Sequence, residues 1–220
     1  MRVIDIMTSD IRLFDTNRFP TEQLRFDDVV DRIKTHFGFE AVYFQSDRHQ
    51  SDQPVFFSLA EGRWNGHRIP EVSVQSRKVV SRVSGATDDC AEVVGELQSV
   101  FSELSAYDDL VPITTTQESV ITAELDIDFE SMFDKRLMGA IDGLASDLTN
   151  SMSVSPAQVT FRVQYETPDK LQRHQIQLSP KPITILRKSD DPEDRAFYET
   201  RMPTDSSTHI GVLEKIEKLF

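Results

Sequence analysis

The stretch from residue 119 to residue 148 constrains the fold most, because its hydrophobic period changes along its length. Between residues 120 and 129 apolar and polar residues alternate, and the polar members are Thr122, Glu124, Asp126 and Asp128. A period of two is typical of a strand with one buried and one solvated face. From Phe133 to Leu148 the apolar residues recur every three to four positions, as on one side of a helix. We therefore predict a strand at 119–129 followed by a helix over about 131–149.

A similar order of elements is predicted on both sides of a connector at 108–118. Each half has the order strand, helix, strand, strand, strand, helix. The last helix of the first half has the clearest pattern, with apolar residues at helical spacing: Cys90, Val93, Val94, Leu97, Val100, Phe101 and Leu104. A matching order over about 100 residues is typical of the duplication of one unit. We therefore predict an internally duplicated α+β protein with halves 1–107 and 119–220.

The predicted strands are joined by connections too short for a crossover helix, which indicates antiparallel neighbours. Their alternation indicates that the sheet buries one face, which the helices would cover. Halves that join edge to edge would form a single curved sheet with one open face. This element order resembles the duplicated arrangement of TATA-binding-protein-like folds, and a pair of helix-grip domains has nearly the same order. The resemblance is one of topology and implies neither an activity nor contacts.

The charge balance is acidic, with 37 Asp and Glu residues against 24 Lys and Arg residues and a net charge of −13. A field of this sign repels phosphate, which disfavours duplex nucleic acid as a partner. The predicted open face also lacks the basic and stacking residues of a nucleic-acid saddle. Its polar members are Thr122, Glu124, Asp126, Asp128, Thr160, Arg162, Gln164, Glu166, Gln175 and Gln177. Acidity can serve solubility alone, but the sharper hypothesis is a basic protein partner.

The sequence also predicts a cellular setting. The single cysteine, Cys90, excludes an internal disulfide and a cysteine-cluster zinc site, which favours a reducing compartment. No apolar run approaches the roughly 20 residues that span a bilayer. Asp5 and Asp10 interrupt the N-terminal stretch before a signal-peptide core could form. We expect a cytoplasmic protein with no membrane segment.

Enzyme and metal motifs are missing from the sequence. It contains no Gly-rich phosphate loop, no nucleophile elbow and no pair of histidines at metal-ligand spacing. The five histidines are scattered, and each is expected to be a surface or partly buried residue: His36, His49, His67, His174 and His209. The acidic run at 190–194 lacks the glycine and terminal glutamate of a calcium loop. We predict no cofactor, no metal and no catalytic residue.

The run from Arg63 to Arg68 is the most distinctive local feature. It contains the only tryptophan, Trp64, beside two arginines, His67 and a glycine turn. Trp and Arg dominate binding hot spots, so the run is a candidate contact surface. The plainer interpretation is a hairpin tip whose tryptophan folds back over the core.

These patterns favour a non-catalytic protein-binding module, an accessory, regulatory or neutralising subunit of the antitoxin or inhibitor kind that acts on a basic partner. The candidate partner-binding residues are Arg63, Trp64, His67, Arg68, Glu124, Asp126 and Asp128. The alternative is a small-molecule-binding protein with an apolar cavity between sheet and helices, which phenylalanines could line. An uncommon enzyme that uses carboxylates is a third hypothesis.

Overall fold

The computed structural model describes residues 1–14, 26–45, 56–75, 78–104, 111–127, 129–140, 157–163, 169–173, 181–188 and 197–220. The elements of the first half are β1 (Arg2–Leu13), α1 (Phe26–His36), β2 (Ala41–Gln45), β3 (Phe56–Trp64), β4 (His67–Gln75), β5 (Lys78–Ser84) and α2 (Thr87–Leu104). The elements of the second half are β6 (Thr114–Glu124), the 3-10 helix η2 (Phe129–Met132), β7 (Gln158–Val163), α4 (Asp169–Arg173), β8 (Lys181–Arg187), β9 (Phe197–Met202) and α5 (Ser206–Leu219).

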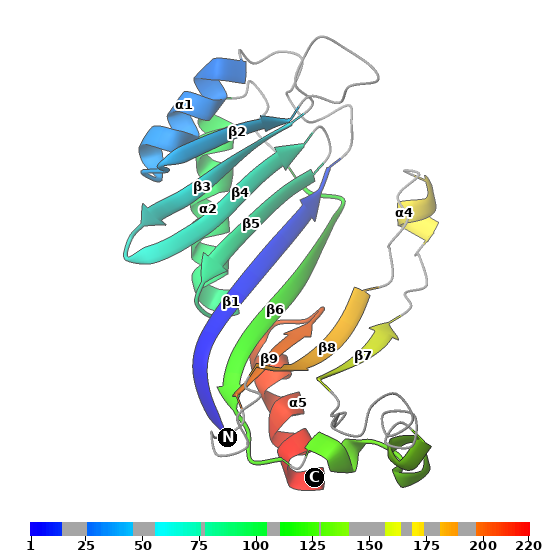
Figure 1. Cartoon of the computed structure of the whole chain (residues 1–220). Helices are drawn as coiled ribbons and strands as arrows, with labels where there is room; N and C mark the ends of the chain where they lie inside the picture. Colours follow the sequence, from blue (N-terminus) through cyan, green and yellow to red (C-terminus); the bar gives the residue numbers. More distant parts are fainter. Residues whose placement is uncertain are drawn as a thin grey trace.

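The described strands form one antiparallel sheet of nine strands, in the order β2-β3-β4-β5-β1-β6-β9-β8-β7. The long strands β1 and β6 lie at its centre and pair from Arg2 opposite Glu124 to Leu13 opposite Thr114. They join the strands of the first half to those of the second, so the sheet continues through the whole molecule (Figure 1). The α+β class and the antiparallel sheet are confirmed.

Helices pack against this sheet over two separate clusters of buried residues. In the first half α2 contacts β1 and β5, and α1 contacts β3 and α2. The residues that fill this first core include Ile33, Phe37, Leu59, Val72 and Leu97. In the second half α5 contacts β6, and the second core includes Ile121, Ala123, Ile185, Tyr198 and Leu213. Among the helices that the structure describes, none is long and apolar enough to cross a membrane.

Strand β6 differs from the prediction at both ends. It was predicted at 119–129 but spans Thr114–Glu124, so it begins within the segment predicted as a connector. Its limits coincide with those of its partner, because β1 offers backbone groups only from Arg2 to Leu13. The three threonines at 114–116 suit a strand, since β-branched residues pack well on a pleated surface. Phe129, predicted in the strand, instead begins η2.

Part of the prediction concerns residues outside the described ranges. The helix predicted from about residue 131 begins later, at residue 135, because residues 129–132 form η2; residues 135–140 are helical, and residues 141–149 lie outside the described ranges. Asp128, the open-face residues Gln175 and Gln177, and the acidic run at 190–194 also lie outside the described ranges.

Candidate functional site

The Trp64 hairpin is fixed by a tight turn and by the core beneath it. Asn65 and Gly66 have φ of +49° and +86°, the combination that an Asn-Gly turn between two strands adopts. Trp64 is half-buried and packs against the first core, with its ring 6.2 Å from that of Phe37. The His67 ring stacks on it at 6.5 Å, with an interplanar angle of 25°. The tryptophan therefore anchors the hairpin to the core and is not an exposed contact residue.

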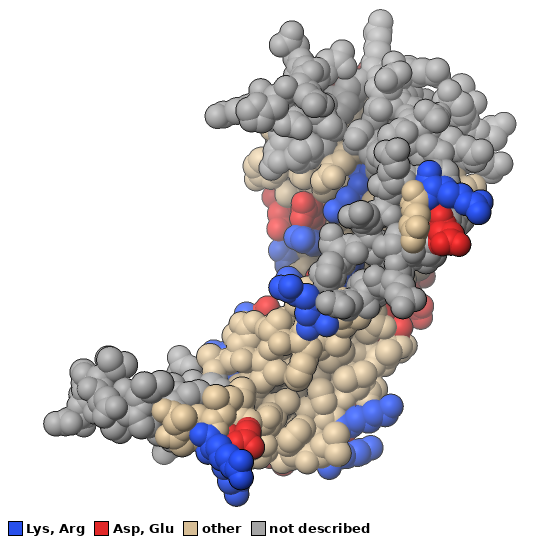
Figure 2. All heavy atoms as spheres, turned by 90° about the vertical axis from the view of Figure 1, so that its right-hand side faces the viewer, with Lys and Arg blue, Asp and Glu red and all other residues tan. Residues whose placement is uncertain are grey.

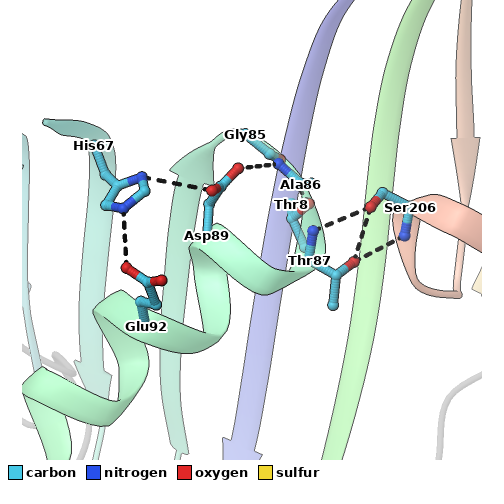
Figure 3. Close-up of polar contacts among 8 residues, drawn as sticks. All are labelled: Thr8, His67, Gly85, Ala86, Thr87, Asp89, Glu92 and Ser206. Atoms are coloured by element: carbon cyan, nitrogen blue, oxygen red, sulfur yellow. Dashed lines mark hydrogen bonds and ion pairs between the residues drawn. The ribbon is translucent and has the colours of Figure 1, made fainter.

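His67 connects the hairpin to the start of α2. Its Nε2 lies 3.3 Å from Oε2 of Glu92, and its Nδ1 lies 3.9 Å from Oδ1 of Asp89 (Figure 3). Asp89 also accepts the backbone N–H of Ala86 at 2.7 Å, which satisfies one of the free donors at the helix N-terminus. The two carboxylates face different nitrogens of the ring, and the described residues contain no group of three His, Cys, Asp or Glu side chains that could hold a metal ion.

The two arginines of the hairpin are both exposed. Arg68 forms an ion pair with Glu61, 2.9 Å apart, on the neighbouring strand. Arg63 lies directly before Trp64 and opposite Arg68, so its side chain is on the face of the hairpin away from the core. Among the residues singled out from sequence, the structure therefore brings Arg63, Trp64, His67 and Arg68 together.

The outer surface of α1 and α2 is strongly acidic. The two helices contain eight carboxylates, one arginine and one lysine, and α2 has no basic residue at all. We call the following set the acidic helical surface: Asp27, Asp28, Asp31, Asp88, Glu92, Glu96 and Glu103. Glu103 lies in the last turn of α2, where a negative charge opposes the helix dipole.

Two contacts join the helices within this surface. Arg32 Nη2 lies 2.9 Å from Glu103 Oε2, and both side chains are exposed. His36 Nε2 lies 2.6 Å from Glu96 Oε1. The two groups are close but not oriented as a hydrogen bond. Exposed pairs of this kind contribute about 1 kcal/mol or less. Four acids of the surface have no ion pair with any described residue: Asp27, Asp28, Asp31 and Asp88.

The open face of the sheet, away from the helices, has mixed charge, and this corrects the expectation of an acidic sheet face. Its acids form ion pairs with basic residues that lie on other strands or directly after one: Glu71 with Arg82, Glu118 with Arg201 and Lys181, and Glu199 with Lys188. Acidic and basic side chains are likewise interspersed on the side of the molecule shown in Figure 2. The difference arises because the sequence did not place β9 beside β6, and β9 brings Arg201 opposite Val120.

The other two described candidates lie at the end of β6, in the second half. Glu124 lies 3.9 Å from Arg2 on β1, and its side chain is mostly buried. Asp126 follows the strand and is exposed, and its backbone N–H donates to Glu217 on α5 at 2.9 Å. The structure therefore does not join these acids to the Trp64 hairpin, which belongs to the other half.

A buried polar cluster lies between β1 and α2. Asp10 is 5% exposed, and Arg12 donates from Nε to its Oδ1 at 3.0 Å and from Nη1 to Gln98 Oε1 at 2.6 Å. Burial raises the pKa of the Asp10 carboxyl, in spite of the neighbouring Arg12. These side chains line a cavity, together with Ser81 and apolar residues, whose interior of about 20 Å³ has room for a water molecule. The lining of this cavity is mainly apolar, and its interior is too small for an organic ligand.

Replacing Asp10 by asparagine is expected to change the free energy of unfolding by about 1 kcal/mol or less. The asparagine oxygen can still accept the hydrogen bond from Arg12, and the desolvation cost of the buried carboxylate is removed. Urea denaturation at neutral pH would measure the change. The control is Asp10→Ala, which leaves no acceptor and should cost about 1–3 kcal/mol. A loss of several kcal/mol in Asp10→Asn would show that the ion pair itself is a strong stabiliser.

Cys90 lies beside this cluster and is buried. Burial, and next the charge of Asp10, raise the pKa of its thiol to about 12. The thiol is therefore protonated and unreactive at neutral pH, as expected for a cysteine on the apolar side of its helix.

A buried histidine is the main feature that the sequence did not reveal. His209 is 0% exposed, with Ser119 Oγ 2.8 Å from its Nδ1 and Thr200 Oγ1 2.9 Å from its Nε2. Thr200 donates its own proton to the Ile121 carbonyl, so it must accept from Nε2–H, and Nδ1 must accept from Ser119. The imidazole is neutral, and burial lowers its pKa to about 4. Both hydroxyl groups are also buried, so this serine–histidine pair is part of the second core.

The N-termini of α2 and α5 meet and exchange hydrogen bonds. The backbone N–H of Thr87 donates to Ser206 Oγ at 3.0 Å, and that of Ser206 donates to Thr87 Oγ1 at 2.8 Å (Figure 3). Each hydroxyl thus satisfies a free donor of the other helix. Asp205, the residue before Ser206, is the N-cap of α5 and accepts the N–H of Thr208 at 2.8 Å. This contact joins the two halves through the helical layer.

No protein-family model and no curated protein matches this sequence.

Proposed function

We propose that the protein is a non-catalytic binding module for a basic protein partner, of the accessory, regulatory or neutralising kind. The observation that carries the proposal is the acidic helical surface, in which four exposed aspartates have no ion pair with any described residue. An unpaired exposed field of one sign steers an oppositely charged partner toward it and suppresses partners of the same sign. The acids of the open sheet face are less suited to this role, since neighbouring basic residues already neutralise them.

The hairpin borders this surface through His67, which faces Asp89 and Glu92 of α2. Arg63 and Arg68 alternate with Trp64 and His67 along their strands and therefore lie on the opposite face of the hairpin, where in the proposal they offer a separate contact. A contribution from Glu124, Asp126 and Asp128 stays a prediction. A reducing cytoplasmic setting belongs to the same proposal, because Cys90 is a free thiol.

We also infer that the two halves arose by duplication. In each half the last strand along the chain pairs with the central strand of that half: β5 lies beside β1, and β9 lies beside β6. In both halves the helix that follows this last strand packs over the central strand of its own half. The exchange between Thr87 and Ser206 is what two equivalent helix N-termini would make across an approximate two-fold axis.

Co-purification from the source of the protein tests the proposed function. The expected result is a basic protein retained at low salt and released in about 1 M salt, where the screening length falls to about 3 Å. Retention that does not depend on salt, or retention of acidic proteins alone, would contradict the proposal. The localisation of the binding to the acidic helical surface is tested separately with charge variants.

A further inference from the structure

Strand β2 is an edge of the sheet with unusually little protection. It pairs with β3 from Ala41 opposite Ala60 to Gln45 opposite Phe56, and no described strand pairs with its other side. Its sequence, Ala-Val-Tyr-Phe-Gln, contains no charge and no proline. Natural sheets protect their edges with charges, proline or bulges, because a free edge is a template for another strand. The edge on β7, by comparison, carries Arg162.

The backbone of β2 has groups available for such pairing. The N–H of Glu40 donates to the Ala60 carbonyl at 3.1 Å, so Ala60 directs its backbone groups toward β2, and Ala41, directly opposite, faces it. Successive residues of a strand direct their N–H and C=O groups to opposite sides. Ala41 and Tyr43 therefore pair with β3, whereas Val42 and Phe44 direct their backbone groups toward the free edge.

Large side chains flank this edge on both faces of the sheet. Tyr43 is 59% exposed and lies opposite Ser58, on the open face. Phe44 is 55% exposed and lies opposite Phe57, whose side chain is in the first core on the helical face. A strand added beside β2 would cover both aromatic side chains, as alternate residues do when a peptide extends a sheet.

The charges near the edge indicate the chemistry of the added strand. Glu40, directly before β2, is exposed, and α1 runs beside this end of the sheet with Asp27, Asp28 and Asp31 on its exposed side (Figure 1). A second copy of this chain, with a net charge of −13, would be repelled there. Carboxylates at the edge instead complement lysine or arginine side chains on an incoming strand.

We propose that β2 is a docking edge for an extended, basic segment of the partner, which adds to the sheet as a further strand and places its cations against Glu40 and α1. The proposal rests on the proposed function, because it identifies how the basic partner would bind. It differs from the proposed function in one requirement: backbone hydrogen bonds at β2 must contribute to the affinity.

The test uses a fluorescent synthetic peptide of about ten alternating lysine and valine residues, long enough to pair with the whole strand. A control peptide has the same sequence but is N-methylated at every second residue, which keeps its charge and removes its outward hydrogen bonds. The protein variant is Val42→Pro, which removes an N–H that β3 does not use. Val42→Thr is the matched control, because it also loses an apolar group and keeps the N–H.

We expect Val42→Pro and the methylated peptide each to weaken binding at least about tenfold, and Val42→Thr to weaken it less. The triple variant D27N/D28N/D31N should also weaken binding. Binding that responds to the triple variant but not to Val42→Pro would overturn the docking edge and leave the proposed function standing. No binding at low salt, or binding that responds to neither, would overturn both. Self-association of the wild type that Val42→Pro abolishes would identify a second copy as the occupant and also overturn the proposal.

Discussion

Leu213→Ala is expected to lower the free energy of unfolding by about 2–5 kcal/mol. Leu213 is 0% exposed and lies on the side of α5 that fills the second core, among Ile121, Ile185 and Tyr198. The substitution removes buried methyl groups and leaves a cavity that the surrounding strands cannot fully close. The shift of the urea midpoint at an unchanged slope would measure the loss.

The same substitution at the other end of the helix is its control. Leu219 is 74% exposed, so Leu219→Ala should change the free energy of unfolding by less than about 0.5 kcal/mol. Equal effects of the two substitutions would contradict the position of α5 against the sheet.

Lowering the pH from 6.5 to about 4 is expected to remove about 3 kcal/mol of stability through His209 alone. The pKa of this imidazole is lowered to about 4 in the folded protein, from an ordinary value of 6.5. Between these two values the unfolded state binds the additional proton, so stability rises with pH in this window and is lost as the pH falls. Urea denaturation at a series of pH values would show the slope.

Nearby carboxyls act in a different window. A backbone hydrogen bond from Asp126 lowers the pKa of Glu217, and hydrogen bonds from Ser207 and Thr208 lower that of Asp205. Their contributions to stability are lost only as the pH falls below the ordinary carboxyl range. The variant His209→Gln should therefore have lower stability at neutral pH and a much smaller slope between pH 6.5 and 4.5. An unchanged slope in this variant would show that another group is responsible.

The alternation around β6 predicted which side chains face the core, and the structure buries Ile121, Ala123 and Leu125 accordingly. It did not predict where the strand begins and ends, because those limits are set by a partner strand more than 100 positions away, where Leu13 meets Thr114. Periodicity is a local property of the chain, whereas the length of a central strand depends on its neighbours.

The candidate site shows the same limit. Composition revealed the excess of acids, but only pairing across strands shows that Glu71 and Glu118 are neutralised on the sheet, whereas Asp28 and Asp88 on the helices have no such partner among the described residues. His209 could have been recognised as buried, because it lies four positions before Leu213 on the apolar side of α5. Its partners Ser119 and Thr200 could not, since they come from two other elements.

The most direct test of the proposed function is the affinity of the co-purified basic partner, measured by titration calorimetry for three forms of the protein. These are the wild type, the helical variant D27N/D28N/D31N, and the control D5N/D134N/D169N, whose three exposed aspartates lie outside α1 and α2. Both variants lose the same net charge, so only the position of the charge differs. We predict that the helical variant binds at least about tenfold more weakly and that the control stays within about twofold of the wild type. Equal losses in the two variants, or a loss in the control alone, would contradict the acidic helical surface as the binding site.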